Sequence, residues 1–229
     1  EPEEGIYDFE WLDRAVALAG KYGLKVIMCT PSPTPPVWLS KKYPDILIRR
    51  DNGVNIQHGR RQHASWSSER YCDFVKNIVT KLAERYGKNP TVIGWQIDNE
   101  PGHYGLVDYS ENAQQKFRLW LRRKYKTIDQ LNATWGNTFW SESYQHFDQI
   151  RLPNQQELPE KPNPHAMLDM NRFMADELAG FVNMQADVLH KNISEKQWIT
   201  TNLIPVFNPV DPVRMDHLDF TTYTRYLVT

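Results

Sequence analysis

The side chain best suited to chemistry is the carboxylate of Glu100, in the stretch Gly94 to Gly102 (GWQIDNEPG). An apolar run precedes it and Pro101-Gly102 turns the chain directly after it, so the carboxylate is expected to project from a strand end. Cleavage of a glycosidic bond needs such a group, because a carboxylic acid must protonate the leaving oxygen while a second carboxylate acts nearby. A solvated loop carboxylate is the alternative. We interpret Glu100 as the general acid and base of a glycoside hydrolase.

The residues before Glu100 suit this role. Trp95 and Gln96 are expected to bury the acid in part and to give it hydrogen bonds. Burial and a second carboxylate across the cleft keep such an acid protonated near neutral pH. Asn99 is expected to donate a hydrogen bond to the sugar hydroxyl beside the reacting carbon. Because Asn-Glu is a common dipeptide, its meaning depends on the fold that carries it.

Helices and strands alternate along the chain. Apolar residues at helical spacing predict helices over 9–22, 71–86 and 167–191, and short β-branched runs predict strands over 24–30, 91–97, 198–203 and 218–223. Gly23 and Gly87 end the first two helices. Repeated helix-to-strand units with buried apolar strands predict a parallel sheet, either doubly wound or closed as a barrel.

The loop lengths favour the barrel. About 40 residues separate the first strand from the next helix, whereas a single glycine separates the first helix from its strand. Barrel enzymes place long loops at the carboxyl ends of the strands, where their chemistry takes place. The sequence has no Gly-x-Gly-x-x-Gly turn, which argues against a nucleotide-binding sheet. We therefore predict an α/β fold of the (β/α)8 TIM-barrel class.

The composition excludes several functions. Lys and Arg total 27 and Asp and Glu total 28, so no broad basic field could attract nucleic acid or an anionic membrane. No apolar run approaches the length of a membrane span. Eight Trp and eleven Tyr include candidate platforms for sugar rings, although most are expected to pack in the core. Cys29 and Cys72 are interpreted as reduced structural thiols.

The two ends of the chain suggest a segment of a longer protein. The chain begins with EPEEG rather than with Met or a signal peptide, and its last residues are still apolar. We expect a cytoplasmic protein, with the compartment open until it is known whether the parent carries a signal peptide.

Several separated stretches resemble one known family. They are EPEEG at 1–5 with YDF at 7–9 and WLD at 11–13, TPSPTPPVWL at 30–39, GWQIDNEPG at 94–102, WGNTFWS at 135–141, TTN at 200–202 and LDF at 218–220. Together they resemble the glycoside hydrolase family 42 β-galactosidases over essentially the whole length. The resemblance implies that residues 1–229 are part of a single TIM-barrel catalytic domain that lacks its first and last strands, covering roughly the third to sixth β/α units.

The resemblance also implies roles for individual residues. It implies a retaining β-galactosidase that acts on terminal β-galactosides, with Glu100 as acid/base, Asn99 as sugar-binding amide and Arg61 in the run GRRQH at 59–63 as a substrate-side residue. Tyr226 matches a tyrosine that can orient the nucleophile. Trp140 matches a tryptophan that can approach the site from a neighbouring subunit, which implies a homo-oligomer such as a trimer. A surface ion pair for Arg61 and a buried helix anchor for Trp140 are the alternatives.

The sequence departs from the family next to Tyr226 and at the cysteine positions of a zinc site. Thr224 stands where Asp is common and Leu227 where Pro is expected, which weakens the assignment of Tyr226. The nucleophilic glutamate is expected downstream of this segment. Many members hold a structural zinc on four cysteines, but Ser65 stands at one of these positions and 103–108 contain no cysteine, so we expect no zinc and no other cofactor.

Two further clusters are interpreted as surface features. His58 and His63 have no preferred ligand geometry for a metal and are expected to be scattered surface imidazoles. The basic residues of 118–126 are expected to form the solvated face of a helix.

Three alternatives to a β-galactosidase remain at this point: an endo-glucanase-like barrel, an arabinopyranosidase, and a carbohydrate-binding barrel without catalysis. A closed pocket would fit a terminal galactose and an open groove would fit a polymer. A glutamate at the end of a later strand of the full-length protein would exclude the non-catalytic alternative.

Overall fold

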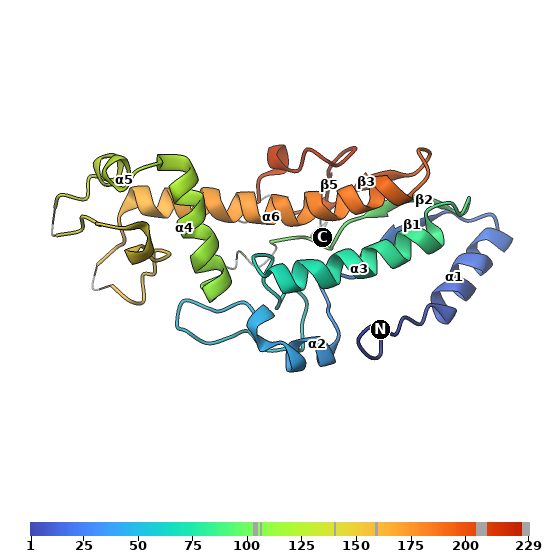
Figure 1. Cartoon of the computed structure of the whole chain (residues 1–229). Coiled ribbons are helices and arrows are strands. Elements are labelled where there is room, and N and C mark those ends of the chain that lie inside the picture. Colours follow the sequence, from blue (N-terminus) through green and yellow to red (C-terminus); the bar gives the residue numbers. More distant parts are fainter. Residues whose placement is uncertain (103–104, 106, 140, 159, 205–209, 226–229) are drawn as a thin grey trace.

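The computed structural model describes the chain except for residues 103–104, 106, 140, 159, 205–209 and 226–229 (Figure 1). The helices are α1 (Glu10–Lys21), α2 (Val37–Lys42), α3 (Glu69–Tyr86), α4 (Glu111–Tyr125), α5 (Ile128–Trp135) and α6 (Pro164–Asn192), with 3-10 turns η1 (Pro44–Ile46), η2 (Phe147–Gln149) and η3 (Pro212–Arg214). The strands are β1 (Val26–Cys29), β2 (Val92–Gln96), β3 (Trp198–Thr200), β4 (Asn202–Leu203) and β5 (Thr222–Tyr223).

The strands are parallel and adjacent in chain order. β2 lies between β1 and β3, and β4 pairs with β5. Only Thr201 separates β3 from β4, and its carbonyl accepts a hydrogen bond from the backbone of Thr222 at 3.0 Å. The described residues therefore supply successive parallel strands, with α-helices between the first three and the 3-10 turn η3 before the last, as part of a (β/α)8 barrel. The predicted barrel segment is confirmed.

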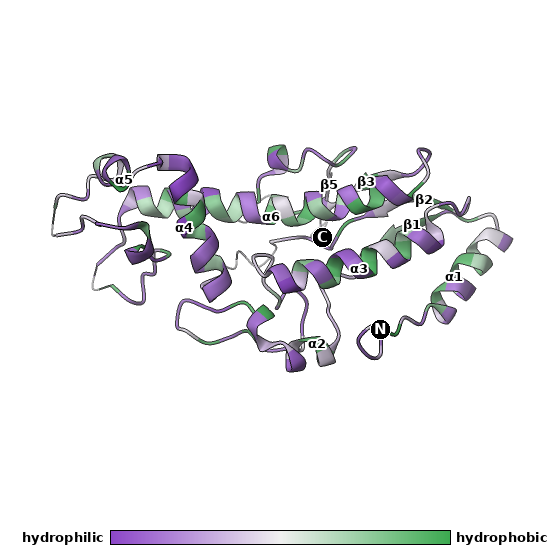
Figure 2. Cartoon of the chain, in the orientation of Figure 1, coloured by the Kyte–Doolittle hydropathy of each residue, from purple (hydrophilic) through white to green (hydrophobic). Residues whose placement is uncertain are grey.

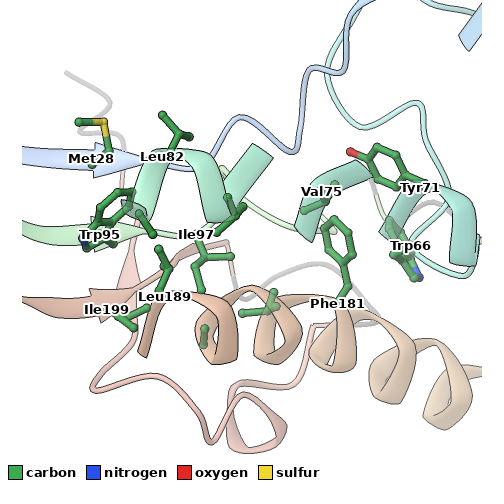
Figure 3. Packing of buried hydrophobic residues seen from close by; sticks show 14 of the residues in the cluster. Met28, Trp66, Tyr71, Val75, Leu82, Trp95, Ile97, Phe181, Leu189 and Ile199 are labelled. Atoms are coloured by element: carbon green, nitrogen blue, oxygen red, sulfur yellow. The ribbon is translucent and has the colours of Figure 1, made fainter. Parts of the chain in front are cut away.

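The main core lies between the sheet and the helices α3 and α6 (Figures 1 and 3). Both helices carry hydrophilic and hydrophobic residues in alternation along their length (Figure 2), as expected of helices with one face on a core. Trp95 and Ile199 project from neighbouring strands toward Leu189 of α6. The indole of Trp95 is fully buried and donates to Gln197 Oε1 at 2.9 Å. This tryptophan is therefore a core residue and no sugar platform.

A glycine on β2 makes room for the ring of Trp198 on β3. A Cβ on Gly94 would stand 2.3 Å from the ring of Trp198, which is well inside van der Waals contact. Only the missing side chain lets the Trp198 ring cover the strand that leads to Glu100.

A second hydrophobic cluster joins α4, α5 and η2 to the first half of α6. With 29 residues α6 is about 43 Å long, so it extends beyond the sheet and carries this lobe (Figure 1). The prediction of a solvated basic face on α4 is wrong in part. Lys124 forms an ion pair with the buried Asp169, and Arg118 donates to the carbonyl of Ile150 at 2.8 Å. The lobe folds back over α4 and provides these acceptors.

Among the described residues, no helix combines the length and the apolar character that crossing a bilayer requires.

Candidate active site

Polar side chains collect where the strands end. Thr30 and Ser32 follow β1, residues 98–100 follow β2, Asn202 begins β4 and Thr224 follows β5. Hydrogen bonds join all of these positions, as described below. The carboxyl ends of the strands thus form one connected polar rim, which is where barrel enzymes carry their chemistry.

The backbone around Glu100 has an unusual conformation. Asp98 has a φ of 56° and Glu100 a φ of 52°, in the left-handed region that side chains other than glycine rarely adopt. Such a conformation costs about 1–3 kcal/mol per residue and persists only where the surroundings enforce it. The neighbouring side chains provide that enforcement through the backbone groups of 98–100.

The carboxylate of Glu100 is buried and paired with Arg61. The Nη2 atom of Arg61 lies 2.8 Å from Oε2 of Glu100, with the two side chains exposed to 30% and 3%. Two of the residues predicted from the sequence, 39 positions apart, therefore meet in one ion pair. A ligand that reaches Glu100 would also meet the guanidinium.

Gln62 holds the two carbonyls of the Asn-Glu pair. Its Nε2 atom donates to the backbone oxygen of Asn99 at 2.9 Å and to that of Glu100 at 2.6 Å. Gln62 is itself buried and left-handed, with a φ of 59°, and its backbone N–H donates to the carbonyl of Pro33 at 2.6 Å. The loop after β1 thus holds the loop after β2 that carries Glu100.

Asn202 holds the same segment from the other side. Its Oδ1 atom accepts the backbone N–H of Glu100 at 3.0 Å. Its Nδ2 atom donates to Thr224 Oγ1 at 2.8 Å and to Asn99 Oδ1 at 3.4 Å. One amide therefore connects the ends of three neighbouring strands.

Asp98 anchors the start of the segment in the interior. Its carboxylate accepts from Ser32 Oγ at 2.6 Å and from the backbone N–H of Asn99 at 2.7 Å. Its own N–H donates to Thr30 Oγ1 at 2.8 Å. Burial raises the pKa of Asp98 to about 6, although both hydrogen bonds to the carboxylate oppose this rise. Tyr71 completes the anchor because its hydroxyl donates to the Ser32 carbonyl.

His63 differs from its prediction. It is buried rather than on the surface, and its Nδ1 atom lies 2.6 Å from the carbonyl of Arg60, so it supports the turn that carries Arg61. Burial lowers the pKa of its imidazole. His58 and His63 meet edge to face at 4.9 Å. Within the described parts of the chain, no three His, Cys, Asp or Glu side chains are grouped as metal ligands would be.

Ser65, which stands where many family members have a zinc-binding cysteine, belongs to a hydrogen-bond cluster. Its hydroxyl donates to the buried carboxylate of Asp108, which also accepts from the backbone of Arg49 at 3.2 Å and from that of Ser110 at 2.8 Å. Burial raises the pKa of Asp108. The cluster ties the loop before α3 to the start of α4.

The structure brings together Glu100, Asn99 and Arg61, as the sequence predicted for a single site. Tyr226 and Trp140 lie outside the described residues. The prediction that Trp95 and Gln96 give hydrogen bonds to the acid is wrong. The indole N–H of Trp95 donates to Gln197, and Gln96 donates to the Asp98 carbonyl at 3.1 Å.

Sequence reasoning missed three residues that hold the acid: Gln62, Asp98 and Asn202. Gln62 stands beside Arg61 in the run GRRQH, Asp98 stands beside Asn99, and Asn202 ends the run TTN. Their positions offered the one available signal, because their own chemistry is unremarkable in a linear sequence.

Comparison with known proteins agrees with this geometry. The family model of the glycoside hydrolase family 42 β-galactosidases matches residues 1–229. The chain belongs to this family. β-Galactosidase BgaA of a Thermus species is 39% identical over 228 residues, which are 99% of this chain and 35% of that protein. The family 42 chain thus spans about a third of the length of the curated relatives that it matches.

Solved structures of family 42 proteins superpose closely. The β-galactosidase from the psychrophilic Marinomonas ef1 gives a TM-score of 0.94 at 37% identity, covering 99% of this chain and 34% of that one. The β-galactosidase from the haloarchaeon Halorubrum lacusprofundi gives 0.93 at 36% identity, covering 99% and 34%. The strand order described above is therefore that of the family 42 fold.

Proposed function

We propose that the protein containing this chain is a retaining, exo-acting β-galactosidase that hydrolyses terminal β-galactosides, with Glu100 as its acid/base. The observation that carries the proposal is the buried carboxylate of Glu100, fixed at the end of β2 and paired with Arg61 at 2.8 Å. The names of the relatives support the substrate class, because they are β-galactosidases.

The chemistry follows from the position of the acid. In the first step Glu100 gives its proton to the glycosidic oxygen while a second carboxylate forms a bond to the anomeric carbon. In the second step the ionised Glu100 takes a proton from water, which attacks the same carbon and releases the second carboxylate. The guanidinium of Arg61, 2.8 Å from Glu100, would donate to a sugar hydroxyl.

The second carboxylate must come from a strand end about 5 to 5.5 Å away. Glu177 does not qualify, because it lies within α6 and pairs with Lys116 at 3.1 Å. Glu195 precedes β3 and so lies at the opposite end of the strands from Glu100. We therefore propose that the nucleophile lies in a part of the protein outside residues 1–229, and that this chain is part of a single barrel domain.

Azide rescue tests the acid/base assignment. The longest open reading frame that contains this chain should hydrolyse an activated aryl β-galactoside, and Glu100→Ala should release the galactose slowly. Added azide should restore the rate and give a β-galactosyl azide, because a small anion needs no general base. Glu177→Ala, a glutamate on α6, is the matched control and should keep its activity. Absence of the β-azide product would refute Glu100 as the acid/base of a retaining enzyme.

The substrate class is tested by comparing the rates on three substrates. The same protein should act faster on the aryl β-galactoside than on the α-arabinopyranoside or on a β-glucan polymer. A preference for either of these would transfer the assignment to an arabinopyranosidase or an endo-glucanase, and no activity on any of them would favour a carbohydrate-binding barrel.

We further propose a cytoplasmic homo-oligomer, with a trimer as the specific hypothesis. Light scattering of the full-length protein should give three times the monomer mass, and cell fractionation should recover the activity in the cytoplasm.

A further inference from the structure

The side-chain amide of Asn202 lies where it can fix the orientation of the side-chain amide of Asn99. Its Oδ1 atom accepts the N–H of Glu100 at 3.0 Å, and its Nδ2 atom donates to Asn99 Oδ1 at 3.4 Å. Thr224 Oγ1 accepts the other hydrogen of Nδ2 at 2.8 Å. Both hydrogens of the Asn202 amide and its oxygen are thus directed at residues 99–100 and at the next strand.

Hydrogen-bond roles allow only one orientation of the two amides. A backbone N–H can only donate, so the oxygen of Asn202 must face Glu100. The Nδ2 atom of Asn202 then faces Asn99 and, since it can only donate, it selects the oxygen of the Asn99 amide. The Nδ2 atom of Asn99 is turned away from Asn202 and makes no hydrogen bond to the described residues. It remains available to a ligand as a donor.

We infer that Asn202 is a positioning residue that fixes the amide of Asn99 as a hydrogen-bond donor to the sugar hydroxyl beside the anomeric carbon. The inference rests on the proposed function, because it specifies how the site recognises that hydroxyl. Hydrogen bonds to the 2-hydroxyl strengthen in the transition state of glycoside hydrolysis, so the orientation of one amide has a direct effect on rate.

The substitution Asn202→Asp changes the orientation and keeps the shape. One carboxylate oxygen of the new side chain still accepts the N–H of Glu100, but the other now faces Asn99. Two facing oxygens repel each other, so the Asn99 amide turns over and donates to the carboxylate instead. The oxygen of Asn99 then faces the sugar, so the donor to the hydroxyl is lost.

The test compares two substrates in two proteins. The ratio of kcat/KM for an aryl β-galactoside to that for its 2-deoxy counterpart measures the use of the 2-hydroxyl. We expect this ratio to be on the order of 100 or more in the wild type and to fall at least about tenfold in Asn202→Asp, mainly because the galactoside reacts more slowly. A purely structural role would slow both substrates equally and leave the ratio unchanged.

Two further variants keep the test decisive. Asn112→Asp on α4 introduces the same charge away from the rim and should keep the wild-type ratio. Asn202→Ala removes the amide without adding charge, so it should also lower the ratio, and it decides the matter if Asn202→Asp does not fold. A wild-type ratio near one, or an unchanged ratio in a folded Asn202 variant, would overturn the inference. Failure of the proposed function would appear differently, as a wild type that hydrolyses neither substrate.

Discussion

Replacing Asp98 by asparagine should change how the stability of this protein depends on pH. The carboxyl group of Asp98 is buried below the rim and its pKa is raised to about 6, with burial as the main cause. The amide of the introduced side chain has the same shape as the carboxyl group and can keep both hydrogen-bond contacts. The amide oxygen can accept the backbone N–H of Asn99, and the amide nitrogen can donate to the hydroxyl of Ser32, which turns to accept.

The sign follows from the two pKa values. Below the ordinary value of 3.8 the group is protonated in both the folded and the unfolded protein. Between 3.8 and about 6 the folded protein keeps a proton that the unfolded chain releases, so stability declines as the pH rises through this interval. At about 1.4 kcal/mol per pH unit, the full decline is about 3 kcal/mol and is complete above the folded pKa.

Urea unfolding from pH 4.5 to 7.5 measures the effect. The difference in unfolding free energy between Asp98→Asn and the wild type should move in favour of the variant as the pH rises, by about 2 kcal/mol within this range. Asp148→Asn, at a side chain exposed to 82%, controls for the lost charge. A difference that stays constant would show that the hydrogen bonds from Ser32 and Asn99 balance burial, and one that moves in favour of the wild type would show that they outweigh it.

Three other substitutions test single contacts. Gln62→Leu removes the donor to both carbonyls of the Asn-Glu pair, so kcat/KM for an aryl β-galactoside should fall about 10- to 100-fold; a loss under threefold would contradict a positioning role. Asp169→Ala leaves buried partners without their acceptor, and thermal or urea unfolding should show a loss of about 3–5 kcal/mol; an unchanged midpoint would show that the network adds nothing. Gly94→Ala should cost about 1–3 kcal/mol because its Cβ meets the ring of Trp198. Gly180→Ala, whose Cβ meets no atom within 4 Å, is its control and should not destabilise the protein.

The elements of the fold could be predicted from local sequence patterns. The helix predicted over 71–86 is observed as α3 (Glu69–Tyr86), and that over 167–191 as α6 (Pro164–Asn192). Apolar periodicity and end signals such as Gly87 are properties of neighbouring residues, so they can be read without knowing the rest of the molecule. Strand boundaries do not follow from local patterns alone, because pairing with a neighbour decides where a strand ends. The strand predicted over 218–223 pairs as a strand only at Thr222–Tyr223.

Long-range contacts explain what local patterns could not predict. His63 was expected on the surface, and burial of its ring depends on how the loop after β1 packs. Arg118 and Lys124 were expected in solvent, but the lobe carried by α6 supplies them with partners. A sequence pattern gives the chemistry of a side chain and leaves open which distant group it meets.

Glu100 shows what the sequence determines and what only the tertiary structure decides. The sequence by itself determined that a carboxylate stands at the end of an apolar strand, since the apolar run and Pro101-Gly102 are local signals. Only the tertiary structure decided that Gln62 and Asn202, 38 positions before it and 102 positions after it, hold its backbone. The reason is physical: parallel strands bring their carboxyl ends to one edge whatever their separation in the chain, and the partners of the acid are selected at that edge.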